Sequence, residues 1–257
     1  MKTGCRLLLG TFTLAVGFAL LPAPAWAGAV KFTVGSIAVP TDVVVPGAAA
    51  SGTEAYAFSW ITARYDEKLA ASQPAHNYGS HAPASAPAVQ KVNGVPFILQ
   101  NIGGELNSTT VLAKKFGNVS LKCVGSDDSA WSPAPAGAFA KLANVEDGPA
   151  YQSILHGFAF GTAAAPLSVT VGHLEVGQPC TVVFWVNSSH VSGNEPTTIT
   201  CGEASVSVTP NVTNLDGGLG HFVTATFEAE GESQTFLFTS AWHPQLNAIE
   251  VIRGQGE

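Results

Sequence analysis

The chain has 257 residues, of which 46% are hydrophobic and 11% are charged, and its formal net charge at pH 7 is −7. So much hydrophobic content with so little charge excludes an intrinsically disordered chain, and the acidic balance without a basic stripe argues against a nucleic-acid partner. The 27 glycines and 16 prolines, set among many Ala, Val, Ser and Thr residues, favour strands and turns over helices.

The first 27 residues have the parts of a secretory signal peptide. Lys2 and Arg6 form a basic start, an apolar stretch follows, and Ala27 ends a small-x-small cleavage motif. We expect cleavage near Ala27 and a mature chain that is secreted, extracellular or periplasmic. The alternative is a retained anchor helix, but the apolar stretch is short against the ~20 residues that a span needs. No second segment of that length follows, so no transmembrane span is expected in the mature chain.

Short segments that are apolar or alternate in polarity, separated by turn formers, predict strands along the mature chain. They are 31–39, 54–62, 96–100, 118–124, 167–171, 180–187, 197–201, 204–209, 221–229, 234–239 and 247–252. One short helix is indicated over 147–158, where a proline stands near the first turn and apolar residues recur at spacings of three and four. We therefore predict an all-β fold, an antiparallel β-sandwich of the jelly-roll type, with 28–257 as a single domain.

Two long loops, at 72–87 and 125–135, are candidates for function. The second contains Asp127 and Asp128, which are adjacent in the sequence. On a strand these residues would point to opposite faces. In a loop they would form a turn or supply oxygen ligands to a structural calcium ion. Calcium is the one cofactor that the sequence suggests, because zinc and redox cysteine motifs are absent. The nucleophile elbow of α/β-hydrolases is also absent, so the sequence does not indicate that class of enzyme.

Aromatic residues among turn formers are the clearest indication of ligand binding. Sugar rings have apolar C–H faces and hydroxyl edges, so their sites combine an exposed aromatic ring with a few polar groups. Trp131 and Trp242 lie in such segments, whereas Trp185 lies in an apolar strand and is expected in the core. The alternative is that the loop tryptophans cover the edge of the sandwich. The candidate ligand-binding residues are Trp131, Trp242, His243 and Tyr78.

The mature chain has three cysteines, and in an oxidising compartment one pair is expected to close. Cys180 begins an apolar run and Cys201 ends a predicted strand, so two neighbouring strands joined by a loop would bring them together. A Cys180–Cys201 disulfide is favoured, which leaves Cys123 as a free buried thiol. Pairing of Cys123 with Cys180 stays open.

Three groups of short motifs stand out: AYAF at 55–58 with VNGVPF at 92–97, LEVGQ at 174–178 followed by VVFWVN at 182–187, and QLNAIEV at 245–251. Together they resemble a largely uncharacterised group of secreted domains common in planctomycetes and verrucomicrobia. The resemblance covers about residues 50–253 and implies a galactose-binding-like or malectin-like β-sandwich. The resemblance implies no catalytic residue in this chain. This chain also lacks the surface-sorting tail that such proteins often have.

The leading hypothesis is a secreted, non-catalytic module that binds a carbohydrate or glycoconjugate. Its basis is the predicted fold together with the loop aromatics. The second hypothesis is a structural or adhesive protein of the cell surface or matrix, which the sparse charge and the Ala/Val/Thr/Gly composition also suit. A hydrolase with an unrecognised site is the third.

Overall fold

The computed structural model describes residues 30–37, 53–59, 89–92, 94–102, 109–128, 150, 154–155, 157–188, 195–212 and 218–254. The predicted signal peptide lies outside these residues. The regular elements of the described part are β1 (Lys31–Ser36), β2 (Glu54–Ser59), β3 (Val89–Val92), β4 (Val95–Asn101), β5 (Leu112–Phe116), β6 (Val119–Cys123), β7 (Gly125–Asp128), β8 (Gly157–Phe160), β9 (Leu167–Gly172), β10 (Pro179–Val186), β11 (Thr197–Cys201), β12 (Ala204–Val208), β13 (His221–Glu228), β14 (Ser233–Thr239), β15 (Gln245–Leu246) and β16 (Ala248–Arg253).

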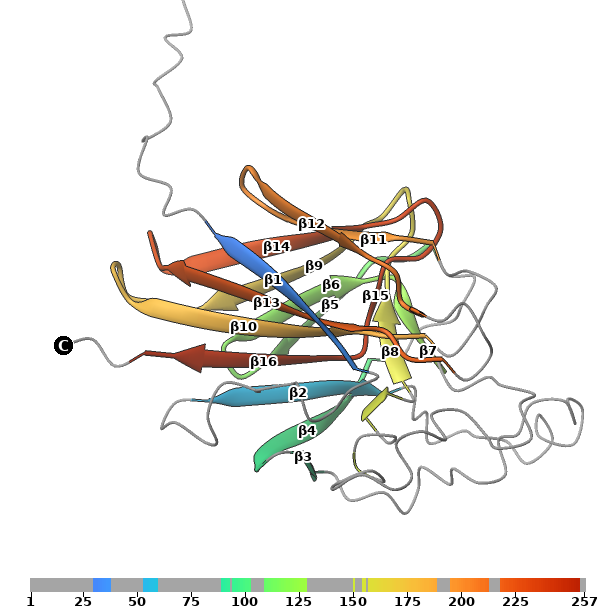
Figure 1. The fold of residues 1–257 in the computed structure, drawn as a ribbon, viewed down its shortest axis with the longest axis horizontal. Coiled ribbons are helices and arrows are strands. Elements are labelled where there is room, and N and C mark those ends of the chain that lie inside the picture. Colours follow the sequence, from blue (N-terminus) through green and yellow to red (C-terminus); the bar gives the residue numbers. More distant parts are fainter. Residues whose placement is uncertain are drawn as a thin grey trace, which may run out of the picture.

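The strands form two packed layers and a small third sheet (Figure 1). The larger layer has seven strands in the order β1-β13-β10-β16-β2-β4-β3, and the smaller has six in the order β12-β11-β14-β9-β6-β5. The third sheet, β15-β8-β7, lies at one end of the sandwich (Figure 1). Neighbouring strands are antiparallel except for β2 and β4, which pair in parallel. The predicted all-β antiparallel sandwich is confirmed.

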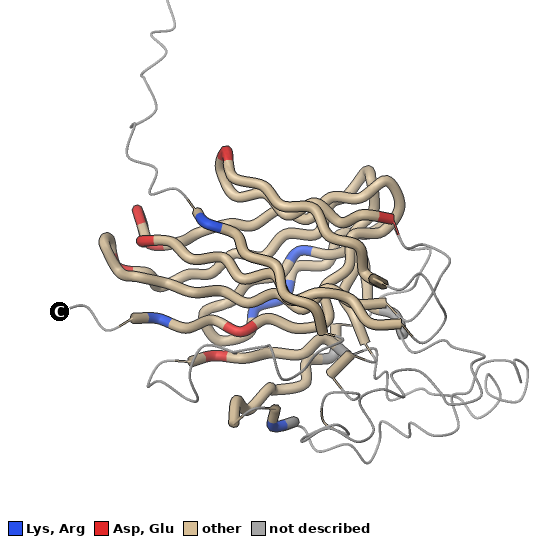
Figure 2. Tube along the Cα trace, in the orientation of Figure 1, with Lys and Arg blue, Asp and Glu red and all other residues tan. Residues whose placement is uncertain are grey.

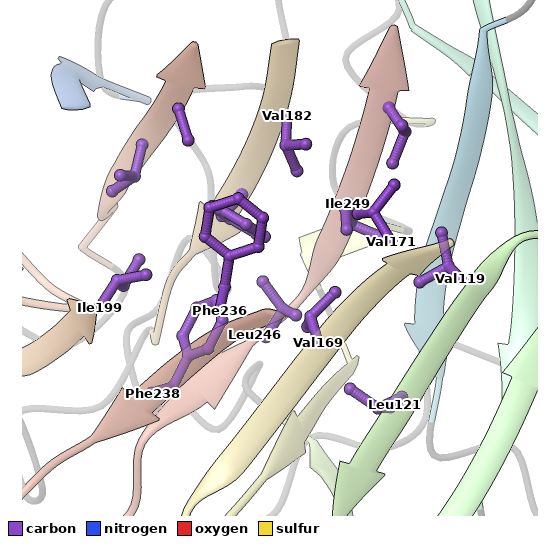
Figure 3. Packing of buried hydrophobic residues seen from close by; sticks show 14 of the residues in the cluster. Val119, Leu121, Val169, Val171, Val182, Ile199, Phe236, Phe238, Leu246 and Ile249 are labelled. Carbon is purple, nitrogen blue, oxygen red and sulfur yellow. The ribbon is translucent and has the colours of Figure 1, made fainter. Parts of the chain in front are cut away.

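The main core fills the space between the two layers (Figure 3). Strand β9 shows why it forms, because Leu167, Val169 and Val171 are buried while the residues between them are only partly buried. Such alternation turns one face of a strand into the core. Aromatic rings cross the layers at the centre, where Phe184 lies 4.9 Å from Phe236 and 5.1 Å from Phe238 between ring centroids.

A second cluster covers one end of the outer face of the larger sheet. Trp185 is fully buried there, with ring centroids 4.8 Å from those of both Phe97 and Phe222. Strand β10 is therefore buried on both faces, which explains its uninterrupted apolar run. The prediction that Trp185 belongs to the core is confirmed.

The predicted helix extends too far at its C-terminal end. In the described part of 147–158, Ala150, Ile154 and Leu155 are helical, but Gly157 and Phe158 belong to β8. Strand β8 pairs with both β7 and β15, so tertiary strand pairing overrides the helical spacing of the apolar residues. No helix among the residues described is long and apolar enough to cross a membrane.

The predicted Cys180–Cys201 disulfide is not formed, and all three described cysteines are free and buried. The two strands are not neighbours: β10 belongs to the larger sheet, while β11 pairs with β12 and β14 in the smaller one. The Cys201 sulfur instead accepts a 2.7 Å hydrogen bond from the Gln234 amide. Burial raises the pKa of the Cys123 and Cys201 thiols to about 11, so both stay protonated at neutral pH.

Candidate functional site

Two of the four predicted ligand-binding residues, Trp242 and His243, lie in the described part of the chain. They occupy the connection between β14 and β15, beside the small third sheet. Trp242 is 48% exposed and is one of few large hydrophobic side chains left open on the described surface. The residue is thus about half exposed, between the two alternatives of a solvent-facing ring and a ring that covers the edge of the sandwich. Trp131 and Tyr78 lie outside the described residues.

The Trp242 and His243 rings form a joined aromatic surface. Their ring centroids are 4.6 Å apart and their planes meet at 50°. His243 in turn packs edge-on against the buried ring of Phe160, at a centroid distance of 5.3 Å. Phe160 belongs to a small apolar cluster with Val124 and Phe158. The exposed indole therefore rests on a histidine that is itself supported by the interior; we call these two rings the Trp242–His243 platform.

Hydrogen bonds fix the orientation of the His243 ring. Its Nδ1 atom lies 3.0 Å from the carbonyl oxygen of Gly161, and the Gly161 amide donates to the Pro244 carbonyl at 3.1 Å. A carbonyl oxygen only accepts, so Nδ1 carries the hydrogen, and in the neutral ring Nε2 is then an acceptor. The platform thus combines an apolar ring face with a hydrogen-bond acceptor beside it.

The position of Gly161 depends on the absence of a side chain. A Cβ atom there would meet the backbone of Leu167 and Ala165 in an overlap that real structures do not show. A glycine lets the two backbones approach closely enough for the bonds to His243 and Pro244. Nothing in the sequence around Gly161 had indicated this role.

A buried asparagine, missed by the sequence analysis, holds the same end of the sandwich together. Asn247 stands between β15 and β16 and is fully buried. Its Oδ1 accepts a hydrogen bond from the backbone amide of Asn187 at 2.7 Å. Its Nδ2 donates to the backbone carbonyls of Leu155 and Gly157, each at 3.1 Å. Three segments that are distant in sequence are thereby joined. The QLNAIEV motif contains this residue, but its sequence signal was only that of a last strand.

The structure does not bring Asp127 and Asp128 to the platform. Both lie in strand β7 rather than in the predicted loop. Gly125 pairs with Phe160, near the platform, whereas Asp128 pairs with Gly157 at the other end of the small sheet. Among the residues that the structure describes, no group of three or more metal-binding side chains is present.

The opposite end of the sandwich carries a polar cluster that ties the two layers together. Glu54 of the larger sheet accepts hydrogen bonds from Arg253 at 2.7 Å, from the Asn118 side chain at 2.7 Å, and from the Asn118 amide and the Tyr56 hydroxyl at 3.1 Å each. Arg253 also donates to the Gly172 carbonyl of the smaller sheet at 3.3 Å. We call this group the Glu54 clamp; in Figure 2 an acidic and a basic position meet there.

The clamp changes the acidity of its members. Although burial opposes ionisation of Glu54, the hydrogen bonds from Asn118 and the charge of Arg253 hold its pKa below the ordinary value. Burial, together with the Glu54 charge, raises the pKa of Tyr56 to about 12. The bonds from Asn118 to Glu54 and from Arg253 to Gly172 run between the two layers, so the clamp helps to hold the sandwich together.

A second glutamate in the larger sheet has no such partners. Glu250 of β16 is fully buried, and neither carboxyl oxygen has a hydrogen-bond partner. Its cross-strand neighbours are Val183 and Ala55, which belong to the apolar outer cluster. Burial alone raises the pKa of this carboxyl to about 7. An acid in this setting is only partly ionised at neutral pH.

Comparison with known proteins gives only weak structural likenesses. No protein-family model matches the sequence, and no curated protein is significantly similar to it. A calcium-binding mutant of Bacteroides uniformis β-glucuronidase 2 superposes with a TM-score of 0.39 at 10% identity, over 63% of this chain and 16% of that one. CBM35 from Cellvibrio japonicus Abf62 superposes with a TM-score of 0.28 at 14% identity, over 39% of this chain and 76% of that one.

A third likeness is to the family GH115 4-O-methyl-α-glucuronidase BtGH115A, with a TM-score of 0.28 at 10% identity, over 38% of this chain and 14% of that one. The chain thus spans a small fraction of both glucuronidases. At these TM-scores and identities the likenesses define neither the ligand nor the activity of this chain. The resemblance to secreted planctomycete and verrucomicrobial domains stays a prediction.

Proposed function

We propose that this chain is an extracytoplasmic, non-catalytic module that binds carbohydrate at the Trp242–His243 platform. The observation that carries the proposal is the half-exposed indole of Trp242 resting against an oriented imidazole. The exposed part of the indole leaves a flat apolar face available to a ligand.

The chemistry of the platform matches the two sides of a sugar ring. The exposed indole offers a flat apolar face to the C–H groups of a pyranose. His243 Nε2 offers an acceptor to a hydroxyl at the ring edge, because Nδ1 is committed to Gly161. Since Phe160 and Gly161 hold the histidine in place, little ordering of this side chain is needed on binding.

The test is a glycan and polysaccharide binding screen on the purified chain, run once with calcium and once with a chelator. For any carbohydrate that binds, Trp242→Ala should weaken binding at least ~tenfold, as expected when a central aromatic contact is removed. His243→Phe keeps an aromatic ring but removes the acceptor, and should give a smaller loss. Calcium dependence would support the predicted structural ion.

A matched control is Val176→Ala, since Val176 is 78% exposed and lies in the connection between β9 and β10, away from the platform. This variant should bind as the wild type does. Unchanged affinity in Trp242→Ala would show that the platform is not the site. A folded wild-type protein that binds no carbohydrate but associates with itself would favour the structural or adhesive hypothesis.

A further inference from the structure

An open hollow of about 570 Å³ lies on the outer side of the smaller sheet, at the clamp end. Hydroxyl side chains from three adjacent strands line it: Ser120 of β6, Thr170 of β9 and Ser233 of β14. Lys115 of β5 lines it on one side, and Glu232 lines it beyond β14 on the other. We call this feature the hydroxyl hollow. Leu174 and Glu175 of the LEVGQ motif also line it, but none of the candidate ligand-binding residues or calcium ligands does.

The sheet register sets the hydroxyls side by side. Lys115 pairs with Ser120, Ser120 with Thr170, and Thr170 with Thr235, so four strands contribute one cross-strand row. Adjacent strands are ~4.8 Å apart, which places the polar groups of the row at regular intervals over about 14 Å. The Thr170 and Thr235 hydroxyls are 2.8 Å apart and hydrogen-bonded, so they are already oriented.

The wall of the hollow is a turn held by backbone bonds. His173 adopts a φ of 55°, a left-handed conformation that is uncommon outside glycine and turns the chain away from β9. On either side of it, the Gly172 amide donates to the Asn118 carbonyl at 2.8 Å and the Leu174 amide to the Glu232 carbonyl at 3.1 Å. Arg253 of the Glu54 clamp also bonds Gly172. The wall is therefore held by backbone bonds to Asn118 and Glu232 and by the side chain of Arg253.

We propose that the hydroxyl hollow is a second carbohydrate site, which binds a saccharide unit through polar contacts and without aromatic stacking. The inference rests on the proposed function and extends it. Hydroxyls, an imidazole, an ammonium and the two carboxylates of Glu175 and Glu232 surround the hollow, so sugar hydroxyls find both donors and acceptors. Hydrogen bonds from the sugar to the charged groups of Lys115 and Glu232 are expected to be stronger than those to the neutral hydroxyls.

The two sites lie at opposite ends of β14. Ser233 begins that strand at the hollow, and Trp242 follows three residues after its last residue, Thr239. Six steps along a strand span ~20 Å, so one glycan chain of several sugars reaches both sites. Linked contacts of this kind raise the apparent affinity for a polymer above that for a short oligosaccharide.

The experiment is calorimetric titration with a panel of disaccharides of glucose, mannose, galactose or xylose, which are too short to span both sites. The variants are Ser120→Ala/Thr170→Val, which removes two hydroxyls of the hollow, and Trp242→Ala, which removes the platform. The matched control is Ser168→Ala/Thr200→Val, on the same sheet face but outside the residues that line the hollow. Thermal unfolding of each variant verifies that it is folded.

We expect two binding events in the wild type and the control. The hollow variant should lose ~tenfold in affinity at one of them, as for two lost hydrogen bonds, and Trp242→Ala should lose the other. A single event that Trp242→Ala abolishes and the hollow variant leaves unchanged would overturn the second site while the proposed function stands. Binding that only the hollow variant weakens would support the hollow and overturn the platform. Absence of binding to every panel member would overturn both.

Discussion

The two ends of the sandwich use polar groups in different ways. At the clamp end, Glu54 and Arg253 connect the layers through side chains that remain partly exposed, at 21% and 11%. At the platform end, Asn247 is fully buried and joins three backbone segments beneath an exposed aromatic pair. One end stabilises the closure of the layers, while the other fixes a surface that is left open. The comparison indicates that polar side chains join the two layers at one end of the sandwich and fix backbone segments beneath a surface loop at the other.

The largest loss of stability should come from Asn247→Ala. The substitution removes three hydrogen bonds and leaves the buried Asn187 amide without its acceptor, which we expect to cost about 3 kcal/mol in the free energy of unfolding. Asn118→Ala at the clamp end should cost about 1 kcal/mol, because its site is only partly buried. Urea denaturation of both variants measures the difference, and a larger loss for Asn118→Ala would reverse the ranking of the two ends.

Between the two ends, Glu250 should make the protein less stable as the pH rises. Its pKa is about 7 in the folded chain against an ordinary value of 4.5. The unfolded chain releases this proton first, so stability is highest below pH 4.5 and falls until the pH passes 7. At pH 8 the total penalty is about 3 kcal/mol, at 1.36 kcal/mol for each pKa unit.

Glu250→Met, which replaces the acid by an apolar side chain of similar length, should remove that pH dependence. The gain over the wild type should grow between pH 4.5 and 7 in denaturation experiments. Glu228→Met, at an exposed position of β13 in the same sheet, is the matched control and should show no such trend. An equal gain at pH 4 and pH 8 would mean that packing, not ionisation, distinguishes the variant.

The Glu54 clamp should respond to pH in the opposite direction. Since the pKa of Glu54 is lowered in the folded chain, its contribution is complete above the ordinary value of 4.5 and is lost as the pH falls through the lowered one. Glu54→Gln keeps the shape but weakens the bonds to Arg253 and Asn118, for an expected loss of about 2 kcal/mol at pH 7. The difference from the wild type should shrink in acid; a constant difference would argue against the charge.

Gly117→Ala tests the backbone of the clamp end and should cost about 1 to 2 kcal/mol. Gly117 has a φ of 52°, and a Cβ there would overlap the Tyr56 hydroxyl. Gly202 has a similar φ of 58° but open space around it, so Gly202→Ala measures the conformational cost without the overlap. Thermal unfolding should rank Gly117→Ala as the more damaging change. Equal losses would show that Tyr56 moves aside freely.

Much of the fold was predictable because its determinants are local. The alternation in β9 and the apolar run of β10 with Trp185 in the core follow from the residues themselves. The end of the predicted helix was wrong because β8 is a strand only when β7 and β15 pair with it. The disulfide prediction failed for the same reason, since no local pattern says which strands become neighbours.

Glu250 and Glu54 show which properties of a polar side chain, its burial and its partners, depend on tertiary structure. Alternation alone separates Glu250 from Ile249 and Val251 and predicts that it faces away from the core. That its face is itself buried follows only from the packing of Ala55, Val183 and the outer cluster. Glu54 meets Arg253 across 199 positions of sequence, a separation at which no spacing carries information. The sequence by itself determined which faces are apolar, and the packing of the sheets decided which polar groups are paired, buried or left open to a ligand.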